Sequence, residues 1–318
     1  MAAGAADPAG QDDPRDTWRA AAWMIGAIAS FTTMAVAGRA VAHELDTFEI
    51  MLWRSVIGVI VVVAVLSLTQ SWGGVSTARL GQHALRNVAH FTGQNLWFHA
   101  VTVLPLATVF ALEFTSPLWV LLLSIPLLGE RPGWTRGLIA LAGFGGVLLV
   151  ARPGADGLDP AIGVAAAAAV AFALTNIATK RLTRVEGIGS ILFWLTAMQL
   201  VFGIAAAGWD GDVAVPSAAA LPWVVGIGLA GLCAHWSLTN ALSLAPASTV
   251  MPVDFARLPL VAGIGAVFYG EGLDPLTLAG GGIVFAAAWG NLALAERGRR
   301  AGAAGRGETA TPEAPRGG

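Results

Sequence analysis

Charged residues are scarce in this sequence. Only 12% of its 318 residues are Asp, Glu, Lys or Arg, and 56% are hydrophobic. A water-soluble chain carries about 25% charged residues, which cover its surface and keep it in solution. The composition therefore excludes an ordinary soluble domain and indicates a membrane protein, with the lipid bilayer as its surroundings.

Residues for cofactor, metal or nucleotide chemistry are also few. The one cysteine, Cys233, excludes an internal disulfide, and the five histidines do not combine with it in a metal-ligand spacing. His43 and Glu44 lack the second histidine of a zinc-protease motif, and no Gly-rich phosphate loop followed by Lys occurs. The positive charges do not cluster on a globular region. We therefore expect no metal, no cofactor, no direct use of ATP and no nucleic-acid partner.

Apolar runs recur along nearly the whole chain. Most of them are about 20 residues long, the length that a helix needs to cross a ~30 Å hydrocarbon core. They are continuous rather than alternating, which argues against membrane strands. We predict an all-α membrane protein with ten transmembrane helices. The predicted segments are residues 20–42, 48–69, 84–104, 106–128, 135–151, 161–180, 188–207, 221–243, 248–269 and 275–295.

The basic residues indicate how these helices are oriented. With a cytoplasmic N-terminus, 14 of the 18 Lys and Arg residues fall on the cytoplasmic side, and only Arg39 and Arg152 fall outside. Arg54 and Arg257 lie within predicted helices. Membrane proteins carry such an excess of positive charge in their cytoplasmic loops. We predict a multi-pass protein of the bacterial inner membrane with both termini in the cytoplasm.

One stretch of the sequence occurs twice. Residues 108–130, TVFALEFTSPLWVLLLSIPLLGE, recur 141 positions later as residues 249–271, TVMPVDFARLPLVAGIGAVFYGE. The same offset aligns Phe31 with Phe172 and Glu113 with Asp254. Each unit contains five predicted helices, an odd number, so the second unit must enter the membrane inverted, as in many secondary transporters. The expected organisation is a disordered tail (1–19), a first repeat (20–154), a second repeat (155–295) and a second tail (296–318).

Several motifs carry a resemblance to a known family. They are LPLATVFALEFTSPLWVLLLSIPLLGERPGWTRGLIALAGFGGVLLVARPG at 104–154, LAPASTVMPVDFARLPLVAGIGAVFYGE at 244–271, MLWRSVIG at 51–58 and LRNV at 85–88. The chain resembles an EamA-type member of the drug/metabolite transporter superfamily. The resemblance implies ten helices, cytoplasmic termini and transport of small organic solutes. It also implies a central cavity lined mainly by the first, third, fourth, sixth, eighth and ninth helices.

Four charged residues lie within the predicted membrane segments. They are Glu113, Asp254, Arg257 and Arg54. Charges at this depth are costly and usually face a cavity or an ionic partner. One interpretation is static pairing, of Asp254 with Arg257 or of Glu113 with Arg54, which only positions helices. The other is functional: an acid binds a proton or a cationic group, and an Arg binds a carboxylate or phosphate.

Uncharged polar and aromatic residues give a second set of candidates. Asn87, His90 and Gln94 follow helical spacing, and Gln94 aligns with His235 at the repeat offset. These side chains either line a cavity or bond to neighbouring helices. The remaining candidates are Thr175 and Asn176 as polar lining, Phe114 and Phe255 as stacking or packing residues, and Glu130 and Glu271 as loop-ordering or gating residues.

The sequence thus favours a secondary transporter that moves a small organic metabolite by alternating access. An amino acid, a nucleotide-like metabolite and a drug-like solute all remain open as the substrate. The two buried acids suggest coupling to protons, and a homodimer is compatible with the sequence. The alternative is a membrane-embedded enzyme acting on a lipid or acyl substrate, with Glu113 or Asp254 as its acid or base. The whole-length repeat argues against that alternative, because catalysis does not need it.

Overall fold

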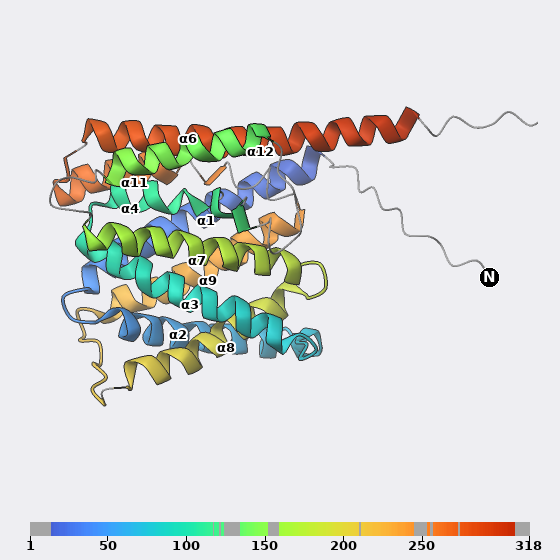
Figure 1. Cartoon of the computed structure of the whole chain (residues 1–318). Coiled ribbons are helices and arrows are strands. Elements are labelled where there is room, and N and C mark those ends of the chain that lie inside the picture. Colours follow the sequence, from blue (N-terminus) through green and yellow to red (C-terminus); the bar gives the residue numbers. More distant parts are fainter. Residues whose placement is uncertain are drawn as a thin grey trace, which may run out of the picture.

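A computed structural model describes most of the chain. The described residues are 14–116, 118–120, 122–123, 134–151, 159–209, 211–244, 253–254, 257–272 and 274–308. Helices account for nearly all of this part, and none of it is strand (Figure 1). The helices are α1 (Pro14–Val41), α2 (Thr47–Leu68), the 3-10 helix η1 (Ser71–Gly74), α3 (Leu80–Val103), α4 (Leu106–Glu113), α6 (Trp134–Ala151), α7 (Pro160–Leu182), α8 (Ile188–Ala207), α9 (Leu221–Leu244), α11 (Arg257–Tyr269) and α12 (Pro275–Glu308).

The all-helical prediction is confirmed for the described residues. Five helices are long and apolar enough to cross a membrane: Trp18–Val41 of α1, and α2, α7, α8 and α9. Local sequence explains where several of them begin. Asp46 and Glu49 form a reciprocal capping box at the start of α2, and Asp159 caps α7, whose first residue is a proline. Such caps satisfy backbone N–H groups that a helix leaves without partners at its first turn.

The predicted continuous helix at 106–128 is wrong in detail. Helix α4 ends at Glu113, and Phe114 and Thr115 form a turn. Pro117 explains the break, because proline has no N–H to donate to the carbonyl of Glu113, four residues earlier. In the second repeat, residues 253–254 are helical and α11 begins at Arg257, while residues 248–252 and 255–256 of the predicted segment lie outside the described residues. The break after α4 lies directly beside Glu113, one of the two acids at the repeated position.

Two described helices extend into the regions expected to be tails. Helix α1 begins at Pro14 rather than at residue 20, and α12 continues to Glu308, beyond the expected end at residue 295. Alanine and arginine dominate residues 294–306 of this extension, and both residue types favour helix. A helix that has already formed lengthens at little cost, because each further residue adds one hydrogen bond.

The helix packing repeats in the same way as the sequence. Helix α1 packs on α9, and their counterparts at the 141-residue offset, α7 and α3, pack on each other. Two further pairs join a helix to its own counterpart: α2 with α8, and α6 with α12. Helix α4 packs on α11, which belongs to the second copy of the repeated stretch. Exchanging the two repeats therefore leaves the main contacts unchanged, which is the pattern that a two-fold axis between the repeats produces.

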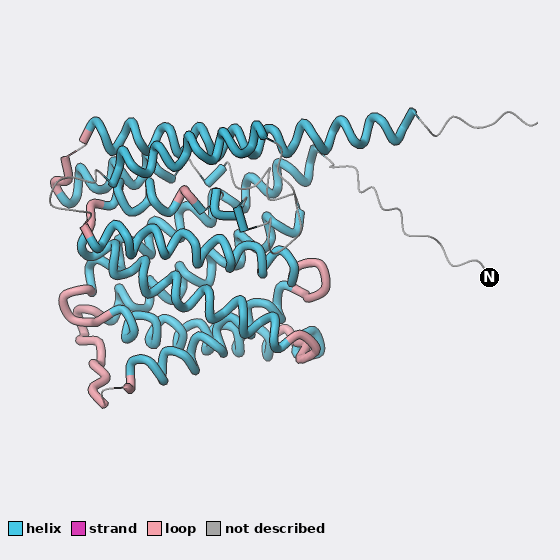
Figure 2. Tube along the Cα trace, in the orientation of Figure 1, coloured by secondary structure: helices cyan, strands magenta, loops and turns pink. Residues whose placement is uncertain are grey.

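The bundle has two distinct ends. Helix α1 starts and α12 leaves at the same end, called the terminal end here, together with the loops at 69–79 and 183–187 (Figure 1). The loops at 42–46, 104–105 and 270–274 lie at the opposite end, called the far end (Figure 2). The ends matter for transport, because a solute must reach the interior from each of them in turn.

Close helix contact makes Gly203 of α8 a testable packing residue. A Cβ at Gly203 would lie 2.9 Å from the Cα of Leu52 on α2, so the two backbones would have to separate. We expect Gly203→Ala to lower the free energy of unfolding by about 1–3 kcal/mol. At Gly226 of α9 a Cβ would meet nothing within 4 Å, so Gly226→Ala should be neutral or stabilise by up to about 1 kcal/mol. Denaturant unfolding in detergent measures both, and equal stability of the two variants would contradict this packing argument.

Candidate functional site

A cavity lies among the helices that the two repeats bring together. Its empty volume, which includes space open to solvent, is about 760 Å³. It is lined from α1, α3, α4, α7, α9 and α11, the elements that the family resemblance implies. The lining residues are Met24, Phe31, Met34, His90, Gln94, Trp97, Glu113, Phe114, Ser116, Phe172, Thr175, Asn176, His235, Leu238, Asp254 and Arg257.

Most of the lining is built from the same positions of the two repeats. Twelve of the 16 lining residues form six pairs at the 141-residue offset. The pairs are Phe31 and Phe172, Met34 and Thr175, Gln94 and His235, Trp97 and Leu238, Glu113 and Asp254, and Ser116 and Arg257. The cavity therefore lies on the axis that relates the repeats, while its chemistry differs between the two sides.

Arg257 joins the two buried acids. Its Nη2 atom donates to Glu113 Oε1 at 2.7 Å and to Asp254 Oδ2 at 2.8 Å. Trp97 Nε1 donates to the other oxygen of Glu113 at 2.8 Å. Only 3% of the Arg257 side chain is exposed, so this cluster has little water to screen it. With both acids ionised, two negative charges share one positive charge, which leaves one negative charge in excess.

Aromatic rings surround the guanidinium of Arg257. Its Cζ atom lies 5.0 Å from the ring centre of Phe31, 4.9 Å from that of Phe110 and 5.4 Å from that of Phe114. Contacts within about 6 Å of a ring face are favourable for a cation. The rings hold the arginine beside the acids, and two of them, Phe31 and Phe114, also line the cavity.

Two histidines form a second polar group in the cavity. The rings of His90 and His235 meet edge-on with their centres 4.6 Å apart. Phe31 contacts His235 with ring centres 5.9 Å apart and also contacts Arg257, so it links the histidines to the charged cluster. The sequence placed these residues on separate predicted helices, and only the fold brings them together.

Many polar atoms around this cavity are buried and find no hydrogen-bond partner among the residues that the structure describes. They are His90 Nδ1 and Nε2, Gln94 Oε1, Ser116 Oγ, His235 Nε2, Asp254 Oδ1 and Arg257 Nε. Each of these side chains lines the cavity. Proteins bury few polar atoms without a partner, because each costs about 1–3 kcal/mol. A solute or water in the cavity would supply the partners that these atoms lack.

Arg54 does not belong to this site, so the predicted pairing of Glu113 with Arg54 is wrong. Arg54 is buried beside Gly231, where a Cβ would lie 2.5 Å from its Nε atom. None of the ion pairs between described residues includes Arg54. It faces a small separate pocket between α2, α8 and α9 together with Gln199, whose Oε1 atom has no hydrogen-bond partner in the described part of the chain.

Asn87 also lies away from the cavity. Its Nδ2 atom donates to the carbonyls of His83 at 2.9 Å and Trp194 at 3.2 Å, and its Oδ1 atom accepts from Arg86 at 3.1 Å. The bond to Trp194 joins α3 to α8, and Gln199 Nε2 of α8 donates to the backbone carbonyl of Asn87 at 2.9 Å. The packing interpretation therefore describes Asn87 better than the cavity interpretation. Its predicted companions His90 and Gln94, one and two turns further along α3, do line the cavity.

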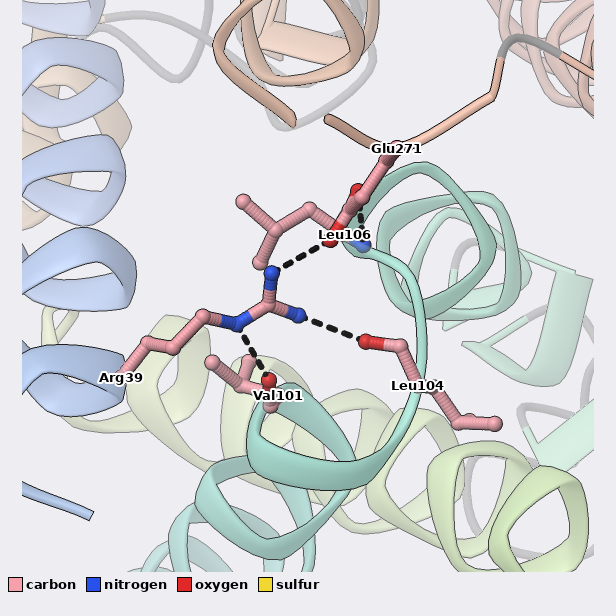
Figure 3. A network of polar contacts seen from close by, with 5 residues as sticks. All are labelled: Arg39, Val101, Leu104, Leu106 and Glu271. Atoms are coloured by element: carbon pink, nitrogen blue, oxygen red, sulfur yellow. Dashed lines mark hydrogen bonds and ion pairs between the residues drawn. The ribbon is translucent and has the colours of Figure 1, made fainter. Parts of the chain in front are cut away.

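The remaining candidates fall into three groups. Thr175, Asn176 and Phe114 line the cavity as suggested. Phe255 and Glu130 lie outside the described residues. Glu271 lies at the far end of α11, away from the cavity, where it contacts Arg39 and Leu106 (Figure 3).

Sequence reasoning missed the apolar part of the lining. Trp97, Phe172 and Leu238 were not proposed for the site, because such residues usually pack in a core. A signal was present nevertheless. Phe172 aligns with Phe31 at the repeat offset, and Trp97 lies one turn after Gln94 on α3.

Comparison with known proteins decides the family. The profile of the EamA-like transporter family matches residues 18–152 and again residues 159–293. The chain belongs to the EamA-like transporter family. The two matched regions correspond to the two repeats, so the resemblance inferred from the motifs is confirmed. Within this family the chain is a multi-pass membrane protein.

This EamA protein is also similar to two curated relatives and to one solved structure. It is 26% identical to an S-adenosylmethionine uptake transporter of Rickettsia bellii, over 83% of this chain and 90% of the relative. It is 30% identical to a riboflavin transporter of Brucella anthropi, over 66% of this chain and 75% of the relative. A solved crystal structure of a chain 21% identical matches 87% of this chain and 96% of its own, with a TM-score of 0.59. That likeness shows that the fold is a known one.

Proposed function

We propose that this EamA protein is a secondary transporter of the bacterial inner membrane that moves a small organic cation or zwitterion with a planar ring. The carrying observation is the cavity on the repeat axis, where one arginine bridges two acids. Solute sites of inverted-repeat transporters lie at the interface between the repeats. The transport pathway lies within one chain, so the proposal needs no second copy and is compatible with a homodimer.

The proposed topology has ten membrane helices in two inverted repeats of five. The helix contacts, which are unchanged when the repeats are exchanged, support it. The position of the charges supports cytoplasmic termini: Arg79, Lys180, Arg181 and Arg184 are all near the terminal end, while Arg39 is at the far end. In this assignment the far end faces outside, in agreement with the positive-inside rule.

The charge of the cavity favours a cationic solute. The excess negative charge of Glu113 and Asp254 over Arg257 attracts a positive group strongly where little water is present. The aromatic lining offers faces on which a planar ring can stack. S-adenosylmethionine, the solute in one relative's name, carries two positive charges, one negative charge and an adenine ring. Riboflavin, the solute in another relative's name, has a planar ring system but no net charge.

Coupling to protons follows from the same excess charge. When the cationic solute leaves, the surplus negative charge remains in a poorly hydrated site, and a proton can neutralise it. Solute and proton then compete for one site. Alternating access would convert this competition into exchange, in which a proton occupies the cavity during the return step.

Purified protein in liposomes tests this proposal. We expect radiolabelled S-adenosylmethionine to accumulate in the vesicles and to exchange with unlabelled solute on the other side. Riboflavin should compete only weakly. Transport of riboflavin alone would contradict the charge argument while leaving the protein a transporter. Recovery of a chemically altered solute would instead favour the alternative of a membrane-embedded enzyme.

A further inference from the structure

At the far end, the side chain of Arg39 joins three segments of the chain. Arg39, near the end of α1, donates from Nε to the carbonyl of Val101 at 2.9 Å and from Nη2 to that of Leu104 at 2.6 Å (Figure 3). Its Nη1 atom forms an ion pair with Glu271, just beyond α11. The backbone N–H of Leu106 donates to the second oxygen of Glu271 at 2.9 Å. Arg39 and Glu271 together therefore connect α1, α3, α4 and α11.

The backbone at the end of α11 directs Glu271 into this position. Gly270 has a φ of +63°, in the left-handed region that glycine adopts without strain. This turn allows the N–H of Glu271 to donate to the carbonyl of Gly265 at 3.1 Å. The side chain of Glu271 lies against Gly265, where a Cβ would be only 2.4 Å from Oε2. Tyr269 packs on Arg39, the other member of the ion pair, with its ring centre 4.7 Å from Arg39 Cζ.

The four connected helices are also helices that line the cavity. On α3, Trp97 lines the cavity, Phe98 is fully buried, and Val101 binds Arg39. On α4, Glu113 lines the cavity, Phe110 is fully buried, and Leu106 binds Glu271. Helix α4 has eight residues, so Glu113 lies roughly 10 Å from Leu106 along the helix axis.

A buried apolar layer therefore separates the cavity from the Arg39–Glu271 pair. Phe98 fills the space against α1 because Gly38 has no side chain there: a Cβ would lie 2.5 Å from Phe98 Cε1. Phe98 and Phe110 both contact the ring of Trp97, with centres 5.2 Å and 5.9 Å away. A solute could leave toward the far end only if these rings and the helices that carry them moved apart.

The second repeat has a counterpart of the bond from Arg39 to Val101, located at the terminal end. The 141-residue offset aligns Arg39 with Lys180 and Val101 with Leu242. Lys180 Nζ donates to the carbonyl of Leu242 at 3.0 Å, the counterpart of the bond from Arg39 to Val101. A basic side chain therefore binds the backbone carbonyl at the same repeat position in each half, Arg39 in the first and Lys180 in the second. This recurrence argues that the bond matters in both halves.

We infer that the Arg39–Glu271 pair is a latch that holds the far end of the transport pathway shut and must break for that end to open. The inference rests on the proposed function, in which the far end faces outside. The pair is mostly buried and adds bonds to backbone carbonyls and an N–H, so it is stronger than a surface ion pair. It ties together the helices that would separate during opening.

Accessibility of the cavity from outside tests the latch without any substrate. The background carries Cys233→Ser, and Met34→Cys places one thiol in the cavity wall. Whole cells are treated with a membrane-impermeant maleimide. We expect Glu271→Gln to raise the labelling rate about tenfold, because a hydrogen-bonded ion pair no longer favours the closed state. Glu44→Gln is the matched control, since Glu44 is at the same end and its carboxylate accepts hydrogen bonds from the backbone N–H and the hydroxyl of Ser217.

The outcomes are distinct. Labelling of Glu271→Gln at the background rate, or equal acceleration by Glu44→Gln, would overturn the latch. If Glu271→Gln is not recovered as a folded protein, Arg39→Gln carries the same expectation and the same refutation. The labelling rate is measured without any solute. A failure to transport every tested solute would therefore count against the proposed function, while the labelling rates would still decide whether the latch exists.

Discussion

Replacing Arg257 with methionine is expected to lower the free energy of unfolding by about 3–5 kcal/mol. The substitution leaves Glu113 and Asp254 close together in a buried site without their shared cation. Removing one partner of a buried ionic group costs this much because the remaining charge is neither solvated nor paired. Thermal or denaturant unfolding of the purified protein in detergent measures the loss.

Two further variants show whether charge, rather than shape, causes the loss. Adding Glu113→Gln and Asp254→Asn to Arg257→Met removes all three charges and should restore most of the stability, because no unpaired charge remains. Arg54→Met is the matched control: Arg54 is also buried, but no ion pair between described residues includes it. Its replacement should be neutral or stabilising. An equal loss in Arg54→Met and Arg257→Met would refute this explanation.

Arg257 and Arg54 differ in a way that shows what the sequence alone could predict. The sequence identified Glu113, Asp254, Arg257 and Arg54 as costly charges in apolar segments, because composition and length reveal membrane depth. It could not assign partners. Arg257 reaches Glu113 from 144 positions away, and that pairing depends on how α4 and α11 approach each other. Arg54, with the same composition around it, faces α8 and α9 instead.

The apolar segments and the internal repeat predicted much of the rest of the fold and of the site. Length and hydropathy located the helices, and the offset aligned acids that prove to share one cavity. The break beside Glu113 was missed, because a proline's local effect depends on whether neighbouring helices stabilise the interrupted backbone. The apolar lining was missed for a similar reason. Phe172 and Leu238 resemble core residues until the packing leaves a cavity beside them.

Removing either acid should preserve the fold but weaken solute binding. In Asp254→Asn the pair of Glu113 and Arg257 remains balanced, and in Glu113→Gln the amide oxygen can still accept from Trp97 Nε1. Each change abolishes the excess negative charge. An attraction of about 3–4 kcal/mol, expected for unit charges ~4–5 Å apart at an effective dielectric constant of about 20, would be lost. Affinity for a cationic solute should fall by about 100-fold or more.

The pH dependence of binding identifies this loss as one of charge. In the wild type, lowering the pH adds the proton that competes with the solute, so affinity should fall as pH falls. In Asp254→Asn and Glu113→Gln the surplus charge is already absent, so the remaining weak affinity should no longer follow pH through this site. Asn176→Ala, a change of an uncharged lining residue, should keep the wild-type pH dependence. Equilibrium binding across a pH series distinguishes these cases. A wild-type pH dependence that survives in both neutral variants would show that the proton binds elsewhere, and Glu113, Asp254 and Arg257 would then serve only to hold the helices together.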